Sequence, residues 1–356
     1  MIRAFNIRDL ALVHRLREQG VSLHTKSALT DSLHPLRGAV VNMLIGGEFP
    51  TLVWKAERGA AAGFIQLYVP EGSNQARILY LSSTPNSEEN GNEKSIDVAT
   101  EVTANGDKES IYIDENVWLP LLDQAVIEAG KRGIHSLVAE VNEIGPELPI
   151  LRYAGFAVYT RQDIWIFDDH ETIKDKPNLV KLTICNATDD WEIQLLYANT
   201  VPRLVQLVEP EPPACQDYEG WVLRENGELA AYAHIYEGHA ATWLGLFIHP
   251  NAETRADDII TAALQVKRLK TTLPVYCCVR RYQSWIQSAL ERNHFTFWGS
   301  QAVMVKHTVH HTQKPLQDLS AVLEQKGITP STPIIQPYRD KKQNGYHKKD
   351  RLRGAD

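Results

Sequence analysis

The sequence predicts a mixed α/β protein built from two similar halves, and three observations support this prediction. Short runs of β-branched and aromatic residues alternate with longer segments whose apolar residues recur at helical spacing. The order of these segments in the first half returns in the second, as a long-period internal repeat. A polar stretch at residues 168–177 lies between the halves and is typical of a linker. The 356 residues leave room for two domains of about 150 residues each.

The first half opens with a strand pattern and a capped helix. Asp9 can cap a helix whose apolar residues follow at helical spacing, and Gly20 can end it. Apolar runs bounded by turn residues then predict further strands, two of which are joined as a hairpin. The strands predicted in this part are residues 2–5, 51–54, 63–69 and 76–81.

Composition changes sharply after these strands. Residues 84–110 carry seven acidic residues and two lysines, a local charge of −5, and they include no tryptophan or phenylalanine. So few large apolar residues cannot offset the entropy cost of ordering the segment. We therefore predict a flexible acidic insertion at about residues 84–112, with a stable acidic face as the alternative.

Helix and strand patterns resume after the insertion and return in the second half. The first half continues with a helix at 118–129, a strand at 136–141, a helix at 147–153 and closing strands at 157–161 and 163–167. The second half has strands at 182–184, 220–224, 228–236, 242–249 and 274–280, helices at 189–195, 254–269 and 282–292, and two short strands within 295–307. A short helix at 316–325 and a basic tail complete the chain. We accordingly predict domains at residues 1–168 and 180–308, followed by a tail at 309–356.

Composition excludes several classes of protein. The formal net charge of −7 argues against a protein that grips nucleic acid, and we expect no nucleic-acid partner. No apolar stretch is long enough for a membrane span or a signal peptide. Four cysteines without metal-type spacing predict neither a disulfide scaffold nor a zinc site. We expect a soluble, reduced, cytoplasmic protein, and the sequence does not predict its oligomeric state.

The order of elements resembles the GCN5-related N-acetyltransferase (GNAT) superfamily. The resemblance is clearest in residues 119–167, where a helix, a strand, a second helix and its Gly155-Phe156 exit follow one another. In the second half it rests on WLGLFIHPNAETRADDIITAALQV and PVYCCVRRYQSWIQSALERNHF, with His294 where glycine is usual. Together with the opening IRAFNIRDLALVHRL, these segments span most of residues 1–307. The resemblance implies two tandem acyl-CoA-type domains.

The resemblance also implies acetyl-CoA as co-substrate. In the family, the pyrophosphate lies at the start of the helix after the fourth strand, on a glycine-containing loop. In the second half Arg255 can open this motif, but Asp258 and Ile260 stand where glycines are expected, and the first half supplies no glycine either. An ordinary capped helix is the alternative interpretation in both halves. The candidate cofactor-binding residues are Leu246, Phe247, Ile248, Arg255, Ala256 and Asp257.

Catalytic groups are less well marked. The family's usual general acid, a tyrosine four residues before the Gly-Phe exit, is replaced by Leu151 and Leu290. Glu140 and Glu237 are the candidate bases, and each also fits an ion-paired strand residue. His234 and His249 fit structural histidines, and the HxxHH run at 307–311 lacks a neighbouring carboxylate or cysteine, so we predict no metal site.

Two functions follow from the sequence. The first, implied by the resemblance, is an acetyl-CoA-dependent N-acyltransferase that moves an acetyl group to the amine of a small molecule or peptide. The alternative is a catalytically inactive tandem module that serves in binding or interaction, because fold does not fix function. An open notch between the fourth and fifth strands of the second half favours the enzyme, and a filled notch favours the module.

Overall fold

The computed structural model describes residues 1–31, 34–56, 61–84, 98–102, 108–111, 113–168, 180–209, 212–215, 219–266 and 273–308. In the first half, the strands are β1 (Ile2–Ala4), β2 (Val21–Ser22), β3 (Thr51–Lys55), β4 (Ala62–Tyr68), β5 (Gln75–Ser83), β6 (Val98–Val102), β7 (Lys108–Ile111), β8 (Ser136–Asn142) and β9 (Ala157–Phe167). The α-helices are α1 (Leu10–Leu16), α2 (Thr25–Thr30), α3 (Pro35–Ile45), α4 (Glu115–Lys131) and α5 (Glu147–Tyr153), and a 3-10 turn, η1 (Ile7–Asp9), precedes α1.

The second half repeats this order with fewer additions. Its strands are β10 (Thr183–Ile184), β11 (Glu219–Glu225), β12 (Glu228–Glu237), β13 (Thr242–Ile248), β14 (Val275–Arg280) and β15 (Thr296–His307). Its α-helices are α6 (Asp190–Thr200), α7 (Arg203–Gln206), α8 (Ala256–Val266) and α9 (Ile286–Arg292), and its 3-10 turns are η2 (Pro250–Arg255) and η3 (Arg281–Gln283). The predicted mixed α/β fold is confirmed, and the repeat predicted from the sequence is visible in the order of the elements.

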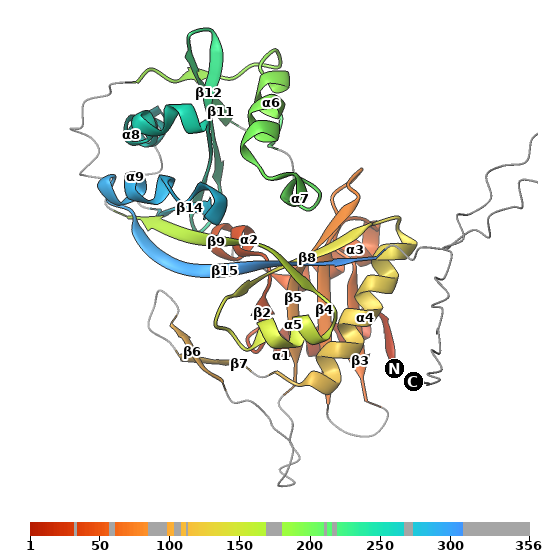
Figure 1. Ribbon diagram of the computed structural model, residues 1–356. Coiled ribbons are helices and arrows are strands. Elements are labelled where there is room, and N and C mark those ends of the chain that lie inside the picture. Colours follow the sequence, from red (N-terminus) through yellow and green to blue (C-terminus); the bar gives the residue numbers. More distant parts are fainter. Residues whose placement is uncertain are drawn as a thin grey trace, which may run out of the picture. The chain divides into compact units, whose positions relative to one another are not determined.

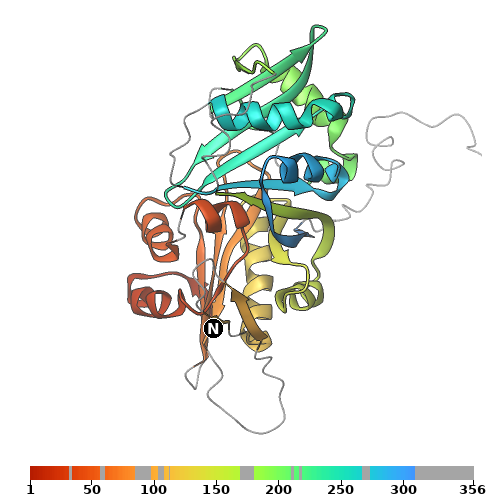
Figure 2. The ribbon, with the colours of Figure 1, turned by 90° about the vertical axis from the view of Figure 1, so that its left-hand side faces the viewer.

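Both halves contribute to one mixed sheet. Its strand order is β1-β3-β4-β5-β8-β15-β9-β14-β13-β12-β11-β10, with β2 paired to β5. Most neighbours are antiparallel, but β5 runs parallel to β8, and β13 runs parallel to β14. In Figure 2, α8 (teal) runs across the strands of the second half, and its apolar residues share a core with β12, β13 and β14.

The last strands of the two halves are exchanged. β15, from the second half, pairs with β8 of the first, and β9, from the first half, pairs with β14 of the second. The two exchanged strands also pair with each other along their length (Figure 1). At the middle of this pairing, Gln162 lies opposite Gln301 and donates to its side-chain oxygen at 2.8 Å. The two halves are therefore tied together through their backbones.

The sequence predicts that each half closes with two short strands. The structure instead has a single long strand at each place, β9 and β15. The division predicted at residue 162 coincides with the residue at which β9, already paired with β15, begins to pair with β14 on its other edge. Pairing on both sides there keeps the backbone extended, so no turn interrupts it.

Each core contains side chains donated by the other half. Trp165 and Phe167 of β9 belong to the core of the second half. Ala302 and Met304 of β15 belong to the core of the first half. Residues Met1–Val309 accordingly form one compact unit.

The two helices before the exchanged strands end in the same way. Gly155 and His294 both have a left-handed backbone, with φ of 86° and 62°. In each case the following phenylalanine N–H donates to the carbonyl of a leucine five residues earlier, Leu151 or Leu290. Both leucines are fully buried, so packing explains their apolar character. His294 thus occupies the place where the sequence pattern called for glycine.

Several predicted segments differ in extent. The acidic insertion contains an antiparallel pair, β6 and β7, while its residues 85–97, 103–107 and 112 lie outside the described residues. The helix expected at 254–269 begins as η2 and continues as α8. The helix expected at 316–325 and the basic tail lie outside the described residues. Within the described part of the chain, no helix has the length and apolarity that crossing a membrane requires.

A disulfide joins Cys185 to Cys215 in the structure, so the expectation of reduced cysteines does not hold for this pair. Cys277 is buried, and Cys278 is partly exposed. The disulfide fixes Cys215 near α6, where its backbone N–H donates to Asp190. The segment just before it, Pro212 and Pro213, contributes to the cavity described below.

The strand exchange predicts that a residue of the second half stabilises the first. Met304→Ala removes a fully buried side chain from the core of the first half, and we expect the free energy of unfolding to fall by about 2–5 kcal/mol. Met304→Leu keeps the volume and should cost less than about 1.5 kcal/mol. Urea unfolding followed by tryptophan fluorescence measures both. A loss from Met304→Ala no larger than that from the exposed Phe297→Ala would contradict the exchange.

Candidate functional site

The two parallel strand pairs diverge after a short stretch of pairing. β13 and β14 are paired only from Thr242↔Val275 to Leu244↔Cys277. β5 and β8 are paired only from Gln75↔Ser136 to Arg77↔Val138. Diverging strands leave backbone groups that need other partners, so each half contains an opening in the sheet.

The opening in the first half is filled by the chain itself. The backbone N–H of Leu23 donates to Leu79 of β5 at 3.0 Å, and its carbonyl accepts from the N–H of Glu140 of β8 at 2.8 Å. The Leu23 side chain is 1 % exposed and packs in the first core. The segment that begins with β2 therefore acts as an inserted strand, and no ligand can occupy this position.

The opening in the second half leads into a cavity of about 440 Å³. This is within the usual range for small-molecule sites, about 300–1,000 Å³. We call it the central cavity, because both halves line it. Its lining from the first half is His24, Lys26, Tyr68, Pro70, Arg77, Glu140 and Gln162, and from the second half Glu209, Pro212, Pro213, His234, Trp243, Gly245, Leu246, Phe247, Cys278, Arg280, Tyr282 and Gln283.

Two carboxylates in the central cavity are held by hydrogen bonds and arginines. Glu140 accepts from the backbone N–H of Thr25 at 2.8 Å and lies 3.5 Å from Arg77. Glu209 accepts from the Arg280 Nε at 2.6 Å and from the Tyr282 hydroxyl at 3.0 Å. These side chains are largely buried, and pairing offsets the cost of burying their charges.

The ionisable groups of the cavity have shifted pKa values. Burial raises the pKa of the Glu140 carboxyl, but nearby positive charges, including Arg77 and Arg280, lower it overall. Burial lowers the pKa of His24 to about 4 and that of His234 to about 3, so both rings are neutral at physiological pH. Burial also lowers the pKa of Lys26 to about 8. The cavity thus holds charged carboxylates and arginines beside neutral histidines.

Packing fixes the wall formed by β12 and β13. His234 stacks on Tyr232 and Phe247, with ring centroids 5.6 and 6.3 Å apart. Gly245 makes room for this ring, because a Cβ there would lie 2.0 Å from His234 Cε1. His234 and Phe247 therefore form an uncharged aromatic wall of the cavity.

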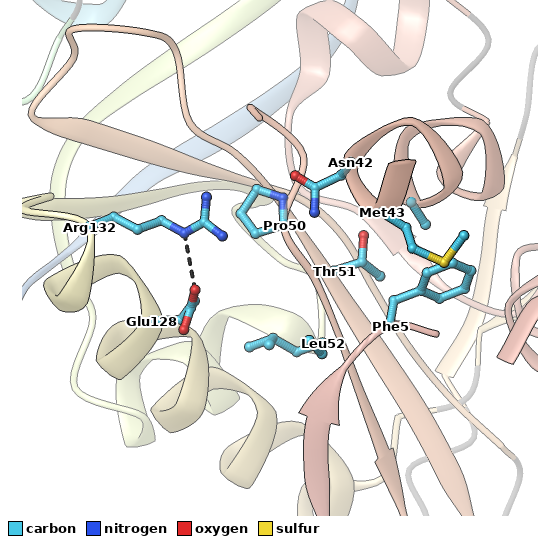
Figure 3. A pocket seen from close by; sticks show the side chains of 10 residues that line it. Phe5, Asn42, Met43, Pro50, Thr51, Leu52, Glu128 and Arg132 are labelled. Carbon is cyan, nitrogen blue, oxygen red and sulfur yellow. Dashed lines mark hydrogen bonds and ion pairs between the residues drawn. The ribbon is translucent and has the colours of Figure 1, made fainter. Parts of the chain in front are cut away.

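Other cavities of the described residues are less suited to a reaction. One of about 540 Å³, lined by the first half and by Tyr236 of β12, shares His24, Lys26 and Tyr68 with the central cavity but is not lined by β13 or β14. A much smaller one, about 50 Å³, lies between α3, α4 and the strands (Figure 3). The Glu128–Arg132 ion pair at 3.1 Å closes part of its wall, and its size admits water but no metabolite.

The predicted cofactor residues are distributed over three environments. Leu246 and Phe247 line the central cavity. Ile248, the last residue of β13, and Ala256, the first residue of α8, are buried in the core of the second half. Arg255 and Asp257 lie at the start of α8, outside the lining of the cavity.

The start of α8 is already occupied by side chains of the protein. Arg255 is paired with Glu225 at 3.0 Å and with Asp258 at 3.4 Å. Asp257 binds Arg292 at 2.5 Å. His249 accepts from the N–H of Asn251, which caps η2. Carboxylates surround Arg255, so this helix start does not provide a cradle for a diphosphate.

The two predicted bases are separated in the structure. Glu140 lines the central cavity with 8 % exposure. Glu237 ends β12 and is not part of that lining. Tyr153 of α5 is 80 % exposed on the surface. Of these three residues, only Glu140 faces the cavity.

Sequence reasoning missed Arg77, Glu209 and Tyr282, three polar residues that meet in the cavity. Glu209 follows α7 in a proline-rich stretch, and Tyr282 follows β14 in η3. A polar residue directly after a parallel strand signals a site, and this signal could have identified Arg280 and Tyr282. Nothing local in the sequence relates Glu209 to them.

Metal ligands do not gather in the described ranges, where no group of three or more His, Cys, Asp or Glu side chains could hold an ion. Two of the three histidines of the HxxHH run, His310 and His311, lie outside those ranges. His307 contacts Tyr159 through its Nε2 at 3.0 Å.

No protein-family model matches the chain, and none of the curated proteins matches it either. Solved structures that are similar to this chain include GNAT acetyltransferases. They include a tandem GNAT protein from the clavulanic acid biosynthesis pathway, with 13 % identity over 87 % of this chain and 99 % of that one and a TM-score of 0.49. A GCN5-related N-acetyltransferase from Sphaerobacter thermophilus has 11 % identity over 87 % and 96 % of the chains and a TM-score of 0.45. A GNAT-family acetyltransferase from Colwellia psychrerythraea has 12 % identity over 86 % and 99 %, with a TM-score of 0.39.

At such identities and TM-scores, the likeness transfers no activity to this chain. The chemistry of this chain therefore has to come from its own residues.

The buried Glu209–Arg280 pair predicts a large effect of neutralising the carboxylate. Glu209→Gln leaves the Arg280 charge buried without its partner, and we expect the free energy of unfolding to fall by about 3 kcal/mol. Glu225→Gln is the matched control: it breaks the more exposed pair with Arg255 and should cost about 1 kcal/mol or less. Urea titration of both variants measures the difference, and equal losses would show that Glu209 is not needed to balance the buried charge.

Proposed function

We propose that the protein is an N-acyltransferase with one working site, formed at the opening between β13 and β14. The observation that carries this proposal is the contrast between the two openings: Leu23 fills the first, whereas the second leads into the central cavity. The donor is an acyl thioester such as acetyl-CoA, and the acceptor is an amine.

The backbone of β13 supplies a hydrogen-bond donor for the thioester carbonyl. The N–H of Thr242 donates to Pro274, toward β14. Because N–H groups alternate along a strand, the N–H of Leu246 points the same way, beyond the last paired residue Leu244. A thioester carbonyl placed in the opening would accept from this N–H, which stabilises negative charge on the oxygen during attack.

The reaction forms a C–N bond and breaks a C–S bond. The ammonium first loses a proton to solvent, and the neutral amine attacks the carbonyl carbon. Sulfur leaves with the bonding electron pair, and Tyr282 gives it a proton. A second proton then passes from the same nitrogen to Tyr282 and replaces the one that Tyr282 has lost, so amide and thiol are the products. Glu140, on the facing wall, attracts the ammonium electrostatically.

Tyr282 is suited to the role of the acid. Burial and the neighbouring Glu209 raise the pKa of its hydroxyl, so the proton is present at physiological pH. Its hydrogen bond to Glu209 orients the phenol within the lining of the cavity, and the hydroxyl rotates from Glu209 to the sulfur when the thiolate forms. This tyrosine follows the strand, whereas the family's usual tyrosine position is taken by buried Leu290.

Removing the Tyr282 hydroxyl should slow the reaction. We expect Tyr282→Phe to lower kcat by about 100-fold or more, with a smaller change in KM, because proton transfer acts in the transition state. Release of free thiol from acetyl-CoA in the presence of an amine panel measures the rate. Tyr153→Phe, at an exposed position, is the control and should keep the full rate. Equal rates for the two variants would remove Tyr282 from the mechanism.

The start of α8 favours a second candidate function, a binding module without acyltransfer. Because Glu225 and Asp258 hold Arg255, the coenzyme's diphosphate has no partner there. If the enzyme proposal is correct, the donor is recognised through its thioester arm. Calorimetry should then give affinities for acetyl-CoA and acetyl-pantetheine within about tenfold of each other.

The matched variant is Arg255→Ala, which should leave both affinities unchanged within about twofold. A strong loss of acetyl-CoA binding alone would show that Arg255 leaves its carboxylate partners for the diphosphate. No binding of either thioester by folded protein would favour the binding module over the enzyme.

A further inference from the structure

The central cavity contains two buried hydrogen-bond donors that no atom of the described residues satisfies: Nη1 of Arg280 and Nε2 of Gln283. Both residues line the cavity, and Gln283 is 7 % exposed. A buried donor without a partner costs about 1–3 kcal/mol, more for a charged group. Native proteins rarely leave such groups unsatisfied, and ligand atoms are one way of satisfying them.

The two donors belong to one rigid corner of the site. Arg280 is the last residue of β14, and Gln283 ends η3, three residues later. Glu209 binds the Arg280 guanidinium through Nε, which fixes its plane and leaves Nη1 directed elsewhere. Tyr282, between the donors in sequence, is held by the same carboxylate. The corner therefore presents a guanidinium N–H and an amide N–H without acceptors.

The chemistry of this corner favours an acceptor that carries negative charge. One of the two donors belongs to the cationic Arg280 guanidinium, and the other belongs to the Gln283 amide. A carboxylate group of a ligand has two oxygens, so it can accept from both donors at once.

Another part of the cavity lining suits the amine. Glu140 is a buried carboxylate on β8. Glu140 and Arg280 line the same cavity of about 440 Å³, so one small molecule bound there can contact both. A molecule that carries both an ammonium and a carboxylate can place the ammonium beside Glu140 and the carboxylate beside Arg280.

We propose that the acceptor is an amino acid or a similar small amino carboxylate, with its carboxylate bound by Arg280 and Gln283. The role of acceptor rests on the proposed function, whereas binding of the amino carboxylate itself requires no acyl donor. The proposal narrows the substrate class from amines in general to amines that bear a carboxylate.

Binding in the absence of any thioester tests the proposal. The probes are the common protein amino acids, β-alanine and γ-aminobutyrate, each compared with its carboxamide by calorimetry on the full chain. We expect at least one acid to bind, and its amide to bind about tenfold more weakly or worse, because the amide has lost the negative charge. Absence of binding by every acid, or equal binding of acid and amide, overturns the proposal.

Gln283→Glu is the decisive variant, since it replaces the amide donor by a carboxylate of the same shape. We expect it to abolish binding of the acid while the protein keeps its circular dichroism spectrum and melting temperature. Gln194→Glu makes the same change on α6, away from the cavity, and should bind normally. If Gln283→Glu fails to fold, Gln283→Ala measures the loss of the donor alone and should weaken binding about fivefold or more. Unchanged binding in the folded variant overturns the proposal.

The two proposals fail in different ways. Selective binding of an amino acid without thiol release from any thioester supports this inference and counts against the acyltransferase. Rapid acylation of simple amines, with no preference for amino carboxylates, supports the acyltransferase and overturns this inference.

Discussion

The exchange of β9 and β15 is the constraint on which the rest of the structure depends. β9 pairs with β14 and β15 of the second half, and β15 pairs with β8 and β9 of the first half. Gln162 lies opposite Gln301, where the pairing of β9 with β14 and that of β15 with β8 begin. A cavity whose walls came from separately folded domains would change shape whenever they moved. Here the walls are strands of one sheet, so residues of the first half, such as Glu140, keep fixed positions relative to Arg280 in the second. The strand exchange thus makes one site out of two repeats.

The two halves solve the same backbone problem differently. Parallel strands that diverge expose N–H and C=O groups, and these must find partners in the chain, in water or in a ligand. In the first half, Leu23 bonds to both strands and completes the sheet. In the second half, the opening is bordered by His234, Phe247 and polar side chains instead of an inserted strand. The same opening is therefore closed by the chain in the first half, where it adds to stability, and leads into a cavity in the second half.

Local patterns in the sequence predict much of this fold, and long-range contacts account for what they miss. Strand and helix positions, the repeat and the paired helix ends at Gly155 and His294 follow from periodicity and turn chemistry, which act over a few residues. The strand exchange does not, because Gln162 and Gln301 are 139 residues apart and nothing near either indicates the other. Glu140 could be identified as a candidate because it lies in a predicted strand. Its ion pair with Arg77 and the Glu209–Arg280 pair join residues far apart in the sequence, so no local pattern indicates them.

The composition of the central cavity is not explained by the stability of the fold. Burying ionisable side chains costs free energy, and apolar residues of similar volume generally give a more stable core than buried ion pairs do. This chain nevertheless places Glu140 and Glu209 with their arginines where the sheet opens, while the equivalent space in the first half is filled by a leucine. The polar corner at Arg280 goes further, since it keeps donors without acceptors. Stability alone does not account for such an arrangement, but it is what a binding site needs when the bound molecule supplies the missing acceptors.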